Sequence, residues 1–139
     1  HRKLAALRDT LEAEIFARIP STTRNGAKEP RLPNTASIAF AGVEAEALLM
    51  MLDQLNICAS SGSACTTGSV APSHVLTAMG LSAAEARSTI RFSLDYETSE
   101  ADVAYLMSHL PRVVAELRTA GSPRSAVRVL QPKLVAHAV

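Results

Sequence analysis

A single thiol, Cys65, lies within a stretch of small uncharged residues that runs from Ser60 to Ser69. These ten residues comprise four serines, two threonines, two glycines, one alanine and the cysteine. Such a segment buries too little apolar surface to offset the entropy lost on ordering, so the sequence predicts a mobile loop. Structural cysteines are usually buried and inert, whereas reactive thiols are accessible. The loop therefore favours a nucleophile or sulfur carrier at Cys65, although composition alone supports an ordinary loop thiol equally well.

Arg91 is the second candidate, because it lies on the polar side of a predicted strand over residues 89–94. In this segment the apolar residues Ile90, Phe92 and Leu94 alternate with polar ones, which is typical of a strand with one buried face. Most such arginines face solvent or form a salt bridge. The functional interpretation is a planar guanidinium that binds a substrate carboxylate, for which arginine is better shaped than lysine.

The other candidate residues favour structural roles. His74 lies in the first turn of a predicted helix, where a capping or packing histidine is favoured over a general base. Cys58 lies in an apolar segment and is interpreted as a core thiol. Asn34 follows a proline and precedes a strand, which is typical of a turn residue. No partner pattern surrounds the remaining histidines, His1, His109 and His137.

Composition restricts the class of protein. The 139 residues are 47% hydrophobic and 19% charged, with a formal net charge of +1, which indicates a globular chain without a strong field for nucleic acid or an acidic partner. No apolar run is long enough to span a membrane, and no leader pattern is recognisable. Two cysteines make a disulfide framework improbable, so we expect a reducing cytoplasm. The chain begins with His1 in a helical pattern, and we expect a piece of a longer polypeptide.

The elements that must position Cys65 and Arg91 alternate between helix and strand. Apolar spacing predicts helices over about 2–18 and 44–55. Capping patterns predict three more helices, over 72–79, from Ser82 onward, and from 98 to about 120. Pro111 should kink or break the last of these helices. Strands are predicted over 37–40, 57–59 and 89–94, with a turn or hairpin connection over 21–34.

This order predicts an α/β fold (a two-layer α+β arrangement) in which helices pack on a small sheet. We expect one domain over residues 1–121 that carries the cysteine loop at 60–71. Residues 122–139 contain two prolines and several basic residues, and we expect a weakly structured tail.

Several segments together resemble the cysteine desulfurases, and among these most closely the nitrogen-fixation and housekeeping iron–sulfur class. The resemblance lies in Ser60-Ser61-Gly62-Ser63-Ala64-Cys65, in Pro72-Ser73-His74-Val75-Leu76, in Arg31-Leu32-Pro33-Asn34-Thr35 and in Ser88-Thr89-Ile90-Arg91-Phe92. It extends over about residues 4–118. It implies the small C-terminal domain of a fold-type I transferase that depends on pyridoxal phosphate.

The resemblance also implies roles for the two candidate residues. Arg91 would bind the carboxylate of L-cysteine, and the thiolate of Cys65 would attack the substrate sulfur, leaving a persulfide and releasing L-alanine. Such enzymes hold pyridoxal phosphate through a lysine in a Ser-x-His-Lys setting, which Lys3, Lys28 and Lys133 all lack. We therefore expect the cofactor to be bound by a missing large domain, no cofactor-binding residue in this chain, and no activity of this chain alone.

Partners follow from the same resemblance. It implies sulfur transfer to a scaffold protein for iron–sulfur cluster assembly, in nitrogen fixation or in general, and a homodimer in the intact enzyme. No resident metal site is expected, and Cys65 is the candidate for a transient iron–sulfur ligand. One departure is Asp95, where the family usually has glycine, which puts the local turn in question.

Two other functions stay open. A free-standing domain could accept persulfide sulfur from a separate enzyme without a cofactor of its own. The start without Met and the Arg91 strand favour the desulfurase, because a carrier needs no carboxylate site. The small domain of a related aminotransferase-like lyase is the third interpretation, and the loop cysteine argues against it.

Overall fold

The computed structural model describes residues 2–27, 30–62 and 72–121. Its helices and strands follow one another as α1 (Arg2–Arg18), β1 (Thr22–Arg24), β2 (Thr35–Phe40), α2 (Ala45–Asp53), β3 (Ser60–Ser61), α3 (His74–Ala78), α4 (Ala83–Arg87), β4 (Thr89–Ser93) and α5 (Glu100–Ala120). The predicted helix over residues 2–18 is confirmed, and the other predicted helices differ from the observed ones only at their ends.

The described strands form one antiparallel sheet in the order β1-β2-β4-β3. The two central strands are the longest and pair over five residues, from Thr35 opposite Ser93 to Ala39 opposite Thr89. The segment 21–34 was predicted as a turn or hairpin connection, and the hairpin is confirmed by the pairing of β1 with β2. The strand β1 itself was missed, because it is only three residues long and one of its neighbours is a breaker-rich segment.

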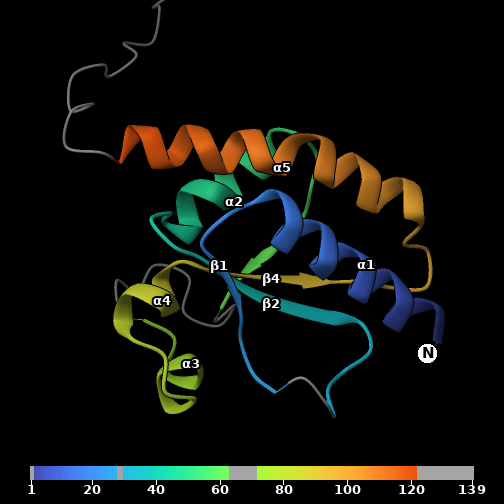
Figure 1. The fold of residues 1–139 in the computed structure, drawn as a ribbon, viewed down its shortest axis with the longest axis horizontal. Helices are drawn as coiled ribbons and strands as arrows, with labels where there is room; N and C mark the ends of the chain where they lie inside the picture. Colours follow the sequence, from blue (N-terminus) through green and yellow to red (C-terminus); the bar gives the residue numbers. More distant parts are fainter. Residues whose placement is uncertain (1, 28–29, 63–71, 122–139) are drawn as a thin grey trace, which may run out of the picture.

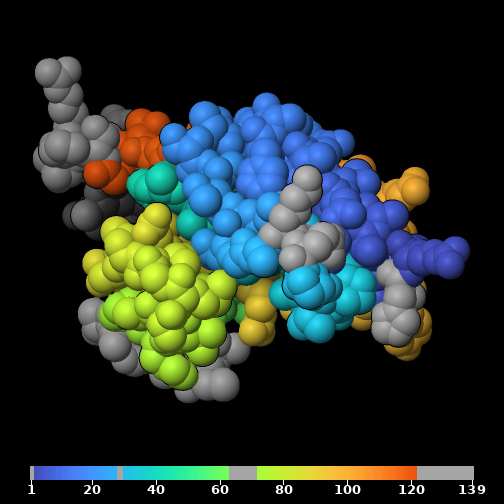
Figure 2. All heavy atoms as spheres, turned by 60° about the horizontal axis from the view of Figure 1, so that its bottom comes forward, coloured from blue at the N-terminus to red at the C-terminus, as the bar shows by residue number. Residues whose placement is uncertain are grey.

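Helices cover the two sides of the sheet unequally (Figure 1). The long helices α1 and α5 lie on one side together with α2, whereas the short helices α3 and α4 lie at one end of the other side. Figure 2 turns this second side toward the viewer and shows α3 and α4 as a yellow-green lobe beside the blue segment that contains β1. The two-layer α+β arrangement that the sequence predicts is confirmed, and the second side of the sheet remains largely free of helices.

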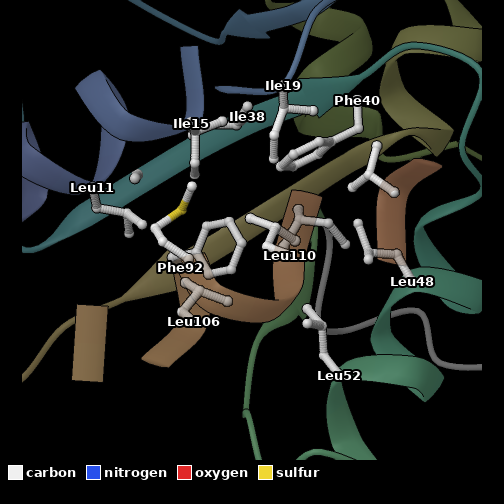
Figure 3. Close-up of a cluster of buried hydrophobic side chains, with 14 of the residues drawn as sticks. Leu11, Ile15, Ile19, Ile38, Phe40, Leu48, Leu52, Phe92, Leu106 and Leu110 are labelled. Carbon is white, nitrogen blue, oxygen red and sulfur yellow. The ribbon is translucent and has the colours of Figure 1, made fainter. Parts of the chain in front are cut away.

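The core lies between the sheet and its three covering helices (Figure 3). In β2 and β4, alternate side chains enter it, as expected for strands with one buried face. Ile38, Phe40, Ile90 and Phe92 are each less than 5% exposed. The helices contribute Leu11, Ile15, Leu48, Leu52, Met107 and Leu110. Burial of these side chains on one side leaves the alternate residues of the same strands for the opposite side.

Serine caps define the starts of two helices, as predicted. Ser82 and Glu85 form a reciprocal capping box at α4, and Ser99 and Asp102 form one at α5. Hydrogen bonds from the serine side chain and backbone hold the pKa of the Asp102 carboxyl below its usual value, and those of Ser82 lower the pKa of Glu85 in the same way.

Of the predicted kink or break at Pro111, the break is wrong, because α5 continues through this residue. Proline removes one backbone donor and crowds the preceding turn, which usually costs about 3 kcal/mol inside a helix. Here Leu110, Val113 and Val114 are all at most 1% exposed on either side of it. Burial of this face stabilises the helix across the proline, and helical hydrogen bonding resumes on both sides.

The predicted strand over residues 57–59 is also wrong. Asn56 adopts a left-handed backbone conformation with φ of 57°, and pairing with β4 begins only at Ser60. Ile57 and Ala59 pack against the core, but Cys58 is exposed and free. The interpretation of Cys58 as a core thiol is therefore wrong, because a short apolar segment does not reveal which of its side chains faces outward.

A buried ion-pair network connects α1 to the segment before β2. Glu12 is 3% exposed and accepts hydrogen bonds from Arg31 Nη1 at 2.5 Å and Arg31 Nη2 at 2.6 Å. Arg24 Nη1 lies 3.5 Å from the same carboxylate. Arg8, which is 3% exposed, donates to the backbone oxygen of Leu32 at 2.6 Å. These contacts hold the chain where it enters β2.

Candidate functional site

Arg91 lies on the side of the sheet that faces away from the core. Its neighbours in β4, Ile90 and Phe92, are buried among the core residues, whereas Arg91 is half-buried on the opposite side. Its Nε is buried and has no hydrogen-bond partner among the described residues. A buried donor without a partner is costly, so this atom is suited to a site that a bound acceptor completes. The predicted placement of Arg91 on a polar side of the strand is confirmed.

Two serines flank Arg91 across the sheet. Ser37 of β2 lies directly opposite Arg91 on one side, and Ser60 of β3 lies directly opposite it on the other. Directly paired residues of antiparallel strands point to the same side, with Cβ atoms about 5 Å apart. The strand register thus places Arg91 between two hydroxyl-bearing residues on the same side of the sheet.

The segment that carries Cys65 starts at this point of the sheet. Ser60 and Ser61, which the sequence placed within a loop, form the short strand β3 and pair with Arg91 and Ile90. Cys65 follows five residues after Ser60 in the sequence and lies outside the described residues. The structure therefore places the beginning of the cysteine segment beside Arg91.

Gly62 packs tightly against the base of α3. A Cβ atom added to Gly62 would lie 2.3 Å from Cδ1 of Leu76 and 3.5 Å from Cγ2 of Thr89. Ser73 is the N-cap of α3, where its Oγ accepts a hydrogen bond from the backbone N–H of Leu76, and this hydroxyl lies 3.5 Å from the carbonyl oxygen of Gly62. Gly62 and Ser73 therefore contact one another at the start of α3.

His74 has neither of the roles favoured from the sequence. Ser73 rather than His74 caps α3, and the His74 side chain is exposed rather than packed. The prediction of a capping or packing histidine is therefore wrong. A proline followed by Ser-His leaves two candidate caps, and serine is the stronger one because its short side chain reaches the N–H of the first turn. Asn34 is a turn residue as predicted, and its Nδ2 also donates to Leu94 O at 3.2 Å.

A hydrogen-bonded group beside Arg91 was missed by sequence reasoning. The Nδ2 of Asn25 donates to Ser37 Oγ at 3.2 Å and to Thr89 Oγ1 at 3.0 Å. Thr89 is fully buried and donates its own proton to Glu85 O at 2.8 Å. Asn25-Gly26 was interpreted only as a turn, and no local pattern reveals that this amide reaches the side of the sheet that carries Arg91.

Two small cavities lie elsewhere on the molecule. One of about 210 Å³ is bordered by Asn56, Cys58, Asp102 and Tyr105, on the core side of the sheet. The other, of about 170 Å³, is bordered by Ser21, Gly42 and Glu85. Both are smaller than typical ligand sites of about 300–1,000 Å³, so we assign neither of them a ligand. Within residues 2–27, 30–62 and 72–121, no three His, Cys, Asp or Glu side chains are grouped as metal ligands.

The one lysine among the described residues does not fit the covalent attachment of pyridoxal phosphate. The sequence contains only three lysines, and Lys28 and Lys133 lie outside the described residues. Lys3 is exposed on α1, which packs on the core side of the sheet, away from Arg91. A lysine that forms a Schiff base must lie at the site where the substrate binds. The described residues thus place no lysine beside Arg91.

A profile of the family described as aminotransferase class-V matches residues 1–106. The chain belongs to this family. Curated relatives carry more specific names. The cysteine desulfurase of Klebsiella pneumoniae is 42% identical over 135 residues, which cover 93% of this chain and 34% of the relative. The cysteine desulfurase NifS of Azotobacter vinelandii is 49% identical over 113 residues, 81% of this chain and 28% of the relative.

Solved structures of class-V relatives have the same fold. A NifS-like protein from Rickettsia africae superposes with a TM-score of 0.70 at 32% identity, over 81% of this chain and 28% of that one. A second NifS-like protein superposes with a TM-score of 0.68 at 25% identity, over 81% of this chain and 27% of that one. The chain spans about a third of the length of the curated relatives that it matches. The resemblance to the cysteine desulfurases is confirmed at the level of sequence and fold.

The departure at Asp95 is accommodated by the local turn. Asp95 has no positive φ, so the backbone does not require the glycine that the resemblance leads one to expect. Its Oδ1 accepts from the backbone N–H groups of Glu97 at 2.9 Å and Thr98 at 3.1 Å. The carboxylate thus stabilises the turn that leads from β4 into α5.

No helix among the described residues combines the length and the apolar character needed to cross a membrane.

Proposed function

We propose that this chain is the C-terminal portion of a pyridoxal-phosphate-dependent cysteine desulfurase, which converts L-cysteine to L-alanine and leaves the sulfur as a persulfide on Cys65. One observation carries the proposal: the segment that leads to Cys65 pairs with the strand of Arg91, with Ser60 directly opposite the arginine. A carboxylate-binding group and the start of a thiol-bearing segment then adjoin one another. Membership of the class-V family and relatives named cysteine desulfurase support the same activity.

Arg91 binds the substrate carboxylate in this proposal. A guanidinium forms two parallel charge-assisted hydrogen bonds to a carboxylate, and its buried Nε is a donor that the described residues leave unpaired. Binding at this point holds the substrate at the edge of the sheet where the cysteine segment begins. Arg91 therefore orients the substrate and takes no part in bond making.

Cys65 is the sulfur acceptor. Its thiolate attacks the substrate sulfur, an S–S bond forms, and the C–S bond of L-cysteine breaks with its electron pair left on the carbon. That carbon takes up a proton, equivalent to the one that the Cys65 thiol released, and becomes the methyl group of L-alanine. No external oxidant is needed, because the two electrons that the sulfur atoms give up in forming the S–S bond are kept by this carbon. The chain after Ser60 then delivers the persulfide to an acceptor.

Pyridoxal phosphate, on which the class-V desulfurases depend, is proposed to be held outside these 139 residues, in a large N-terminal domain. None of the chain's three lysines lies in the Ser-x-His-Lys setting that the resemblance implies for the attachment site. We assign no cofactor-binding residue to this chain, and we expect it to be inactive alone.

The remaining parts of the proposal concern the organisation and partners of the intact enzyme. We propose a small domain over residues 1–121, a weakly structured tail over 122–139, a homodimer in the cytoplasm, and an iron–sulfur scaffold protein as the sulfur acceptor, with Cys65 as a transient cluster ligand. A free-standing persulfide carrier is less well supported, since it would not need the carboxylate-binding group that Arg91 provides.

The test is the mass of the intact enzyme after incubation with L-cysteine, together with release of L-alanine. We expect one additional sulfur atom on the parent and none on the Cys65→Ala variant. The matched control is Cys58→Ala, which removes the other thiol, exposed and outside the proposed site, and should gain the sulfur as the parent does. Equal persulfide formation on Cys65→Ala and the parent would contradict the assignment of the acceptor.

The carboxylate role of Arg91 is tested by Arg91→Ala in the same enzyme. Loss of a charge-assisted bidentate contact removes about 1.5–3 kcal/mol of substrate binding, so the KM for L-cysteine should rise by at least tenfold with a smaller change in kcat. Steady-state kinetics of L-alanine release provide both constants, and an unchanged KM would remove this role.

A further inference from the structure

The side of the sheet that carries Arg91 contains a chain of hydrogen bonds whose direction can be deduced. Thr89 donates its hydroxyl proton to Glu85 O at 2.8 Å, so its Oγ1 can only accept from Asn25. The Asn25 amide must therefore turn its nitrogen toward Thr89, at 3.0 Å. The second proton of the same nitrogen is donated to Ser37 Oγ at 3.2 Å.

Ser37 is consequently an acceptor toward Asn25 and keeps its own proton. A hydroxyl has one donor and two acceptor positions. No hydrogen bond donated by Ser37 is found within the described ranges, while its oxygen is occupied by Asn25. Ser37 is only partly buried, on the side of the sheet that faces away from the core. Its free proton thus lies on the same side as the guanidinium of Arg91.

The strand register places Ser37 next to Arg91. Ser37 lies directly opposite Arg91 in the β2–β4 pair, and their Cβ atoms are about 5 Å apart in such a pair. Asn25 is held close by its own backbone, because its N–H donates to Ser37 O at 2.9 Å. Arg91 Nε is a buried donor without a partner in the described part of the chain. Two donors, one charged and one neutral, therefore lie side by side without an acceptor.

We propose that Ser37 is a second binding residue for the substrate carboxylate and that Asn25 is its positioning residue, an inference that rests on the proposed function. The Ser37 hydroxyl donates to one oxygen of the carboxylate that Arg91 binds. Asn25 directs this proton by occupying the serine oxygen and fixes its position through Thr89. The chain therefore recognises its amino-acid substrate through a charged fork and a neutral hydroxyl together.

The first experiment compares Ser37→Ala and Asn25→Ala with the parent in the intact enzyme. Because the variant loses a hydrogen bond to a charged group, Ser37→Ala should raise the KM for L-cysteine about tenfold, which corresponds to about 1.4 kcal/mol, with kcat changed less than twofold. Asn25→Ala should raise KM about threefold, because the serine proton loses only its direction. Ser37→Thr keeps the hydroxyl and should restore KM to within twofold of the parent.

The matched control is Ser93→Ala. Ser93 lies two residues after Arg91 on the same strand and the same side, but it pairs with Thr35 and not with Ser37. The KM of the Ser93→Ala variant for L-cysteine should equal that of the parent. Melting temperatures of all variants separate a loss of folding from a loss of binding, and a KM that is unchanged in Ser37→Ala overturns the inference.

A second readout does not depend on desulfuration. Phenylglyoxal modifies Arg91, and L-alanine, which has the same carboxylate, should protect it in the parent, as measured by peptide mass spectrometry. Half-protection should need about tenfold more L-alanine in Ser37→Ala. An enzyme that makes no L-alanine from L-cysteine contradicts the proposed function, whereas the protection measurement still decides the role of Ser37. Equal half-protection in parent and variant, or no protection in the parent, overturns the inference.

Discussion

At the scale of single residues, the sheet register decides what surrounds Arg91. The arginine is exceptional in its strand because its buried Nε has no described partner, and because serines lie opposite it on both sides. Sequence alternation correctly predicted which side of the strand Arg91 occupies. It could not predict Ser37, Ser60 and Asn25 as its neighbours, since these residues come from three other segments of the chain.

Gly62 is the residue whose side-chain size matters most for the start of the cysteine segment. A methyl group at this position would lie 2.3 Å from Cδ1 of Leu76, which is 4% exposed and has little room to move. We expect Gly62→Ala to lower the free energy of unfolding by about 1–3 kcal/mol, which is typical of overpacking. Urea denaturation followed by circular dichroism measures this difference.

The cause of that loss is tested by repeating the substitution in a Leu76→Ala background. Because the atom that clashes is then absent, the added methyl group should cost at least 1 kcal/mol less than in the parent. Gly121→Ala is the control, since its nearest contact would be 3.4 Å away. Equal losses in both backgrounds would mean that Leu76 does not limit the space at Gly62.

At the scale of elements, the charge network between α1 and the segment before β2 explains how the strand next to Arg91 is anchored. Glu12 holds Arg31 through two hydrogen bonds, although Arg31 lies 19 positions away in the sequence. Amphipathic spacing predicted α1 correctly, but the same pattern gave no indication that a glutamate on its buried side would be paired. Burial of a carboxylate is tolerated here because guanidinium groups surround it.

Removal of the Glu12 carboxylate should be far more destabilising than removal of an exposed one. Breaking a buried ion pair costs about 3–5 kcal/mol, and since Arg31 keeps 16% of its side-chain surface exposed, we expect Glu12→Gln to cost about 3 kcal/mol. Glu14→Gln is the control, because Glu14 pairs with Arg18 at the surface and should contribute less than about 1 kcal/mol. Chemical denaturation of both variants measures the loss in the free energy of unfolding. Similar losses for Glu12→Gln and Glu14→Gln would contradict this expectation.

The capping box at the start of α5 makes stability depend on pH. Hydrogen bonds with Ser99 lower the pKa of Asp102 in the folded state, so the carboxylate stabilises the fold at pH values above its unfolded pKa. This stabilisation is lost as the pH falls through the lowered folded pKa. Asp102→Asn should therefore flatten the acid side of the stability curve relative to the parent, measured by urea midpoints over about pH 2–7. Parallel curves would show that Asp102 contributes nothing to this dependence.

At the scale of the whole molecule, the described residues place Arg91 beside the start of the segment that leads to Cys65, with no described lysine next to them. The chain matches about a third of the length of its curated relatives. Its α+β fold superposes on slightly more than a quarter of the length of two solved NifS-like structures. The proposed activity therefore belongs to a larger assembly in which this unit supplies substrate recognition and the sulfur acceptor.

Complementation tests this division of roles. The 139-residue chain, incubated with pyridoxal phosphate and L-cysteine, should gain no sulfur alone, because the lysine that attaches the cofactor is proposed to lie in the other part of the enzyme. When the cofactor-binding part of the enzyme is supplied, Cys65 should gain one sulfur atom, seen by intact mass spectrometry. The Cys65→Ala chain is the control for the position of the sulfur. Sulfur gained on Cys65 without the second part would contradict the proposed location of the cofactor.

The sequence by itself determined the helices with strong apolar spacing, the capping boxes and the alternation of β4, because these depend on residues within a few positions of one another. It also predicted a fold of helices on a small sheet and a resemblance that the family match confirmed. Only the tertiary structure decided that Cys58 faces outward, that α5 continues through Pro111, and that Ser37 lies opposite Arg91 and accepts a hydrogen bond from Asn25. Those outcomes depend on strand register and on burial against distant segments, and no local pattern of residues encodes them.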